Sequence, residues 1–127
     1  MSEDIKLNSH GTNAKIKFHI LRDKNMRKIG FSDLDGKNWY YCRNVFRSRD
    51  NEDWISFSVT IPKDGSDGWV DVLDEAFCQP YDWQMMLARY EDNPPIAAVI
   101  VNHRVIAEML QLQALGVISG YREGDYI

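Results

Sequence analysis

The stretch NPPIAAVIVNHRVIAEMLQLQALG, residues 93–116, decides the fold. Asn93 can cap a helix, Pro94 fits its first position, and Gly116 suits the left-handed residue just past its end. Residues 96–115 contain no Gly or Pro, so they can form one helix of about 30 Å. Apolar side chains cover more than half of its circumference, and we therefore expect a helix that is buried on several sides.

The chain before this helix predicts a series of short strands. Residues 14–22 (AKIKFHILR) alternate strictly between apolar and polar side chains, which is typical of a half-buried strand. Further strands are predicted at 26–33, 38–47, 54–61 and 69–73, separated by turns rich in Gly, Asp and Asn. In the third strand we expect Trp39, Tyr41 and Val45 on one face and Tyr40, Cys42 and Phe46 on the other.

Helical signals appear in the second half of the chain. Pro80 fits a helix start, and residues 81–90 can form about three turns before the break at 91–93. The tail after Gly116 can add an edge strand through Val117 and Ile118. Strands first and helices second predict an α+β domain, in which two C-terminal helices cover one face of an antiparallel meander of about five strands. We expect a flexible arm at 1–13 and a single domain at 14–127.

Composition points to a folded cytoplasmic protein. Of its 127 residues, 44% are hydrophobic and 12% aromatic, which excludes a disordered chain. Cys42 and Cys78 form no CxxC motif, which favours reduced thiols. No signal peptide or apolar run long enough to span a bilayer is found, so no membrane association is expected.

The residues that commonly hold metals do not cluster in the sequence. His10, His19 and His103 are scattered, and none has a Cys, His or carboxylate at ligand spacing. The turns at 33–36 and 64–68 resemble calcium loops superficially, but neither has alternating oxygen ligands followed by a Glu. We expect ordinary turns there, and neither a metal nor a cofactor.

No catalytic motif is present. The sequence lacks a GxSxG elbow, a Walker loop and a dinucleotide fingerprint. Asp71, Asp74 and Cys78 could nonetheless form the site of a small hydrolase or transferase, if they converge in one pocket with shifted pKa values. The alternative interpretation is an acidic solvated edge beside a small buried cysteine, and enzymatic activity is therefore uncertain and less expected than binding.

Charge is divided unequally along the chain. The net charge is −4, with +3 on residues 1–61 and −7 on residues 62–127. The strand half combines Lys and Arg with aromatic side chains, which suits a binder of single-stranded nucleic acid. No Lys/Arg cluster exceeds two adjacent residues, and the overall charge is acidic. Direct nucleic-acid binding is thus the less favoured interpretation.

The acidic half suggests a surface for a protein partner. Eight carboxylates fall within residues 64–92 and alternate with aromatic residues. Aromatic side chains can bury hot-spot area while carboxylates steer a basic partner, such as a nucleic-acid-binding protein. The solvated interpretation, in which these acids only maintain solubility, stays open, as does oligomerisation. The candidate contacts are Asp71, Asp74, Glu75, Asp82, Glu91 and Asp92, with Trp83 and Tyr121 as exposed anchors.

Two segments carry a resemblance. WVDVLDE (69–75) with FCQPYD (77–82), and GVISGY (116–121) with GDYI (124–127), resemble small uncharacterised proteins of phages and mobile elements of Gram-positive bacteria. The resemblance covers the C-terminal half and implies no catalytic residues. It implies an accessory protein that binds and blocks host machinery in the bacterial cytoplasm, and inhibitors of CRISPR effectors are one such group.

Overall fold

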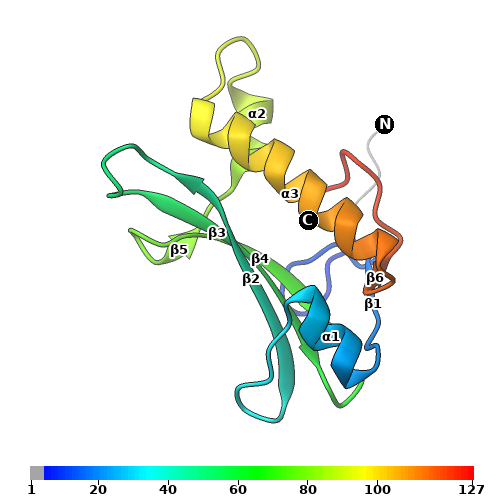
Figure 1. Ribbon diagram of the computed structural model, residues 1–127. Helices are drawn as coiled ribbons and strands as arrows, with labels where there is room; N and C mark the ends of the chain where they lie inside the picture. Colours follow the sequence, from blue (N-terminus) through cyan, green and yellow to red (C-terminus); the bar gives the residue numbers. More distant parts are fainter. Residues whose placement is uncertain (1–4) are drawn as a thin grey trace.

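A computed structural model describes residues 5–127 and confirms an α+β fold (Figure 1). Its centre is a four-stranded antiparallel sheet in the order β2–β3–β4–β5. The bounds are β2 Asn38–Arg47, β3 Trp54–Pro62, β4 Trp69–Asp74 and β5 Gln79–Pro80. The predicted strands at 38–47, 54–61 and 69–73 are therefore present.

A β-bulge in β2 changes which side chains face the helices. Asn44 pairs with Ser56 and Phe46 with Ile55, so Val45 is the extra residue and lies with Phe46 opposite Ile55. Val45 is buried, and Phe46 packs against the core. The expectation that Phe46 belongs to the opposite face was wrong, because a strict period of two cannot anticipate an inserted residue.

Helix α3 (Ile96–Ala114) crosses the sheet, as Figure 1 shows, and confirms the predicted long helix. Its residues Ala98, Val101, Val105, Met109 and Leu112 are buried. Two polar contacts join it to β2: the Tyr41 hydroxyl donates to Glu108, and the Arg104 guanidinium donates to the Val45 carbonyl at 2.9 Å. The second contact ties α3 to the bulged residue of β2.

The predicted strand at 26–33 was wrong, because helix α1 (Asp23–Ile29) occupies its first half. Met26 and Ile29 are spaced by three residues, and Met26 is fully buried. Asp23 lies in the first turn, and Gly30 ends the helix with φ at +123°. The spacing of Ile29 and Phe31 also fits a strand, and this short segment was therefore ambiguous.

The N-terminal segment and the tail complete the fold. β1 (Lys17–Phe18) is shorter than the predicted strand at 14–22, and it pairs with β6 (Ile118–Ser119) of the tail. The expected flexible arm is folded over residues 5–13, where Thr12 is buried and its hydroxyl bonds the backbone of Val70. Residues 1–4 of that arm lie outside the described residues.

Candidate functional site

Helix α2 (Trp83–Arg89) packs against α3 through the face that carries Trp83, and its other face, which carries Met85, is exposed. The Asp82 carboxylate accepts from the backbone N–H of Met85 and caps the helix. The Trp83 indole is buried, and its N–H donates to the Asn102 Oδ1 on α3 at 3.1 Å. The residues after the helix then form the connection to α3.

We call the outer face of α2, together with this connection, the helical tip. An apolar groove lies on it. The groove has a volume of about 460 Å³ and is lined by Asp82, Met85, Met86, Arg89, Tyr90 and Pro95. Met85 is 54% exposed and Tyr90 is 50% exposed, and Ile96 beside Pro95 is more exposed still. Large apolar side chains that are exposed together mark an interaction surface more often than isolated ones do.

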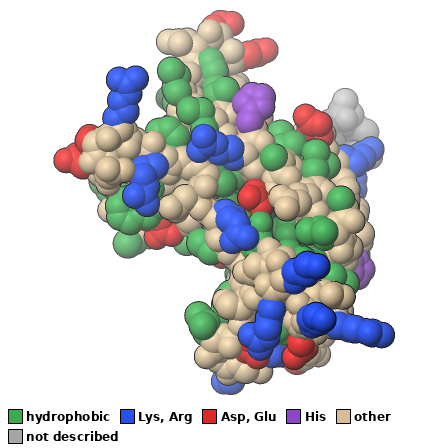
Figure 2. Space-filling view, in the orientation of Figure 1, with side chains coloured by type: hydrophobic (Ala, Val, Ile, Leu, Met, Phe, Trp, Pro, Cys, Tyr) green, Lys and Arg blue, Asp and Glu red, His purple; other side chains and the backbone are tan. Residues whose placement is uncertain are grey.

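Carboxylates surround the helical tip. Asp82 lines the groove itself, while Glu91 and Asp92 are exposed in the connection between α2 and α3. Figure 2 shows Asp and Glu side chains at this end of the molecule and Lys and Arg side chains around α1 at the other. Three of the predicted contact acids, Asp82, Glu91 and Asp92, thus share one surface with apolar side chains.

Asp74 and Glu75 belong to a different place, the turn between β4 and β5. The Asp74 carboxylate accepts from the backbone N–H of Ala76, and Glu75 accepts from the Ser56 hydroxyl. Phe77 beside them is 68% exposed. Cys78 was expected to be buried, but it is exposed and has φ at +51°, because it turns the chain from β4 into β5.

Asp71 lies in a smaller pocket behind the tip. This pocket has a volume of about 220 Å³ and is lined by Asp71, Tyr81, Asp82 and Trp83 among others. Burial raises the pKa of the Asp71 carboxyl above its ordinary value, although a hydrogen bond from Trp69 and the charge of His10 oppose the shift. Neither Asp74 nor Cys78 lines this pocket, so the described residues do not bring the three groups together in it.

Trp83 and Tyr121 are not the exposed anchors that we expected. Each is 4% exposed. The backbone N–H of Tyr121 donates to the Gln113 Oε1 at 2.8 Å, and its carbonyl accepts from the same side chain at 2.9 Å. Burial and the nearby Asp125 and Glu123 raise the pKa of Tyr121 to about 12. Both aromatic residues therefore stabilise the fold.

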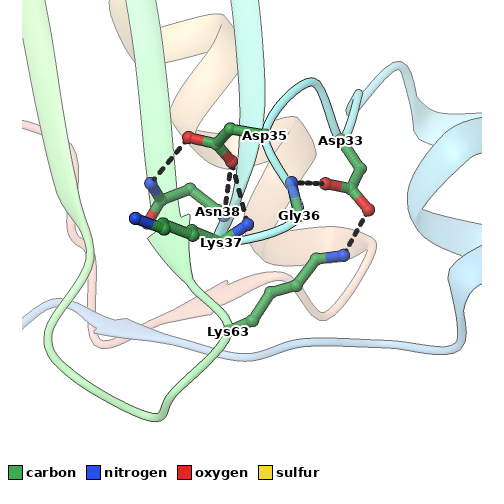
Figure 3. Close-up of polar contacts among 6 residues, drawn as sticks. All are labelled: Asp33, Asp35, Gly36, Lys37, Asn38 and Lys63. Carbon is green, nitrogen blue, oxygen red and sulfur yellow. Dashed lines mark hydrogen bonds and ion pairs between the residues drawn. The ribbon is translucent and has the colours of Figure 1, made fainter.

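The acids of the loop before β2 bond to backbone groups of the loop and to a neighbouring lysine (Figure 3). Asp33 accepts from the Gly36 N–H and pairs with Lys63, while Asp35 accepts from the backbone N–H groups of Lys37 and Asn38. The Lys37 N–H and other donors hold the pKa of Asp35 at about 2. Both carboxylates thus serve the loop itself.

A search of residues 5–127 finds no cluster of three His, Cys, Asp or Glu side chains arranged for a metal ion. His103 was expected to be half-buried, but it is exposed on α3. Within the same residues, no helix is both long and apolar enough to cross a membrane.

The sequence reasoning missed the apolar half of the helical tip. It treated residues 81–90 as a cover for the sheet, whereas α2 buries mainly Trp83 and leaves Met85 and Tyr90 outside. The available signal was the apolar run Met85–Leu87, because adjacent residues lie about 100° apart around a helix. Met86 and Leu87 pack against the core, and Met85 is left exposed.

Comparisons with known proteins give no further guidance. No family model, no curated protein and no solved structure matches the chain.

Proposed function

We propose that this protein is a non-catalytic binding module, and that its helical tip docks onto a basic surface of a protein partner. The single observation that carries the proposal is the apolar groove at the tip, lined by Met85 and Tyr90 and bordered by Asp82, Glu91 and Asp92.

The composition of the groove suits such a role. Methionine is flexible and polarisable, and a Met-lined surface can adapt to the shape of a partner. Tyrosine is enriched at interface hot spots, where its ring is buried and its hydroxyl can still bond. Tyr90 and Met85 would supply buried area, while the carboxylates would speed association with a positively charged partner. Arg89 lines the same groove and could pair with an acid of that partner.

The setting of the proposal comes from the sequence resemblance. A phage or mobile-element accessory protein that blocks a basic, nucleic-acid-binding surface of a host protein, as an anti-CRISPR inhibitor does, would need an acidic surface with apolar anchors. Such a protein would act in the cytoplasm of the bacterial host.

Affinity capture tests the proposal. Tagged wild-type protein and the variant Met85→Ala/Tyr90→Ala would be incubated with a nuclease-treated lysate of a Gram-positive bacterium, and bound proteins identified by mass spectrometry. We expect one partner that elutes with salt from the wild type and is lost from the variant. The matched control is Phe77→Ala, which removes an exposed aromatic ring at the β4–β5 turn. Equal capture by all three proteins would contradict the assignment to the tip.

One observation favours a second candidate, a small enzyme that uses Asp71. Its carboxyl has a raised pKa and lines a pocket with Tyr81. Screening a library of small molecules by the chemical shifts of residues 70–72 and 81–83 would test this candidate. Ligands that perturb these shifts in the wild type and not in Asp71→Asn would support it, and a screen without any would contradict it.

A further inference from the structure

A second groove, lined by apolar and polar side chains in equal number, lies at the other end of α3. It has a volume of about 410 Å³ and is lined by Leu21, Asn25, Lys28, Ile29, Gln111 and Leu115. Leu115 is exposed. Ile20 and Leu110, which precede the lining residues Leu21 and Gln111 in the sequence, are exposed as well. We call this surface the α1 groove, because Asn25, Lys28 and Ile29 belong to α1 and Leu21 lies two residues before it.

The charge around the α1 groove is opposite to that of the helical tip. Residues 22–28 (RDKNMRK) carry four Lys or Arg and one Asp, whereas residues 90–96 (YEDNPPI) carry two acids and no base. Lys24 and Lys28 lie four residues apart on one face of α1, and neither pairs with a carboxylate of residues 5–127. Figure 2 shows the Lys and Arg side chains gathered around α1.

The two surfaces cannot meet within one chain. Pro95 at the tip precedes α3, and Gln111 and Leu115 lie at its C-terminal end. The 19 residues of the helix separate them by about 28 Å at 1.5 Å per residue. Contact between the two surfaces therefore requires two molecules.

From this complementarity we infer that the helical tip of one copy docks into the α1 groove of a second copy. This inference rests on the proposed function, because it assigns a partner to the same tip. Tyr90 and Ile96 are the apolar side chains that enter the groove, and Glu91 and Asp92 lie opposite Lys24 and Lys28. The contact is heterologous, so a dimer keeps one free tip and one free groove, and further copies can add head to tail.

Self-association of this kind has a consequence for the proposed function. A tip that occupies the groove of a neighbour is hidden from a basic host protein. High protein concentration thus competes with partner binding, and dilution or salt releases the tip, because exposed charges are screened by salt.

The test uses two complementary charge-reversed variants. Lys24→Glu/Lys28→Glu has a damaged groove and an intact tip, while Glu91→Lys/Asp92→Lys has a damaged tip and an intact groove. Sedimentation velocity would be measured at low salt from about 10 µM to about 1 mM, the range in which weak contacts associate. We expect the average mass of the wild type to rise at least about 1.5-fold over this range, with neither variant rising alone.

The equimolar mixture of the two variants gives the sharpest result. It contains the intact tip with the intact groove, and also a reversed tip with a reversed groove whose charges again attract, so we expect heterodimers and larger mixed complexes that neither variant forms alone. The control Lys17→Glu/Arg49→Glu makes the same change in net charge as Lys24→Glu/Lys28→Glu, at residues that line neither groove, and should behave as the wild type does. Circular dichroism spectra of all variants would verify that each is folded.

Three results would overturn the inference. They are a wild type that stays monomeric at every concentration, a mixture that does not form heterodimers, and association that persists in each variant alone. In each case the lysate capture with Met85→Ala/Tyr90→Ala still tests the proposed function separately, because it measures a different partner with different substitutions.

Discussion

Gly120 should be the least replaceable glycine of the chain, and Gly116 provides a matched control. Both residues have φ in the left-handed region, at +80° for Gly120 and +86° for Gly116. A Cβ on Gly116 would meet no atom within 4 Å. A Cβ on Gly120 would lie 2.2 Å from the carbonyl oxygen of Lys15. The two substitutions to Ala thus differ by one steric clash.

The expected magnitudes follow from this difference. Ala in a left-handed conformation costs about 1 to 2 kcal/mol, and this cost applies to both variants. In Gly120→Ala, Lys15 and the tail must also separate. The neighbouring Ile118 and Tyr121 are buried and would lose packing, which typically costs about 2 to 5 kcal/mol for a large core side chain. We expect a loss of about 1 kcal/mol for Gly116→Ala and at least about 3 kcal/mol for Gly120→Ala.

Urea unfolding followed by tryptophan fluorescence would measure both free energies of unfolding. The free energy of unfolding falls by about 1 to 3 kcal/mol per molar urea, so the two expected losses give the two variants different midpoint urea concentrations. A difference below about 0.5 kcal/mol between the two variants would refute the reasoning, because the packing of the tail on Lys15 would then contribute nothing.

Three further predictions concern the site and its support. Trp83→Phe should cost about 1 to 3 kcal/mol, because the Asn102 Oδ1 loses its donor, and urea unfolding should show no comparable loss for Phe77→Ala at its exposed position. Asp71→Asn should stabilise the protein on the order of 0.5 kcal/mol at pH 7. A raised folded-state pKa favours the protonated carboxyl, so this gain should vanish near pH 3, and thermal melts at both pH values would show it. The pKa of Tyr121 is raised to about 12, so its contribution to stability is complete below pH 10 and lost between about pH 10 and 12. Tyr121→Phe should flatten the alkaline loss of stability in urea titrations, and an unchanged slope would contradict the assignment.

The long elements could be predicted from the sequence because several signals agree in them. Residues 93–116 combine end signals with a wide apolar surface, and residues 55–61 alternate strictly over seven positions. Short segments lack this redundancy. In residues 26–33, Met26 and Ile29 fit a helix while Ile29 and Phe31 fit a strand, and contacts with the rest of the core decide between them.

The site was predicted in part for the same reason. Carboxylates are exposed almost wherever they occur, so placing Asp82, Glu91 and Asp92 on the surface needed no tertiary information. Aromatic residues occur both in cores and at interfaces, and their exposure depends on what lies opposite. Asn102 on α3 accepts from Trp83 and holds it inside. Tyr90 is 50% exposed, and this exposure could not be foreseen from its own neighbours in the sequence.

Backbone groups on the edge strand β2, and on the part of β4 that β5 does not cover, carry a consequence for peptide binding. On β4, Thr12 bonds the backbone of Val70, and the Tyr81 N–H donates to the Val72 carbonyl. On β2, the Arg43 guanidinium donates to the carbonyl of Cys42, and the Arg104 guanidinium donates to the carbonyl of Val45. An extended peptide that added itself as a fifth strand would have to displace these groups first. In the proposed binding role, side chains rather than an added strand would therefore recognise the partner, and surface substitutions could change that partner without changing the backbone. A surface of this kind can diverge rapidly on a constant scaffold.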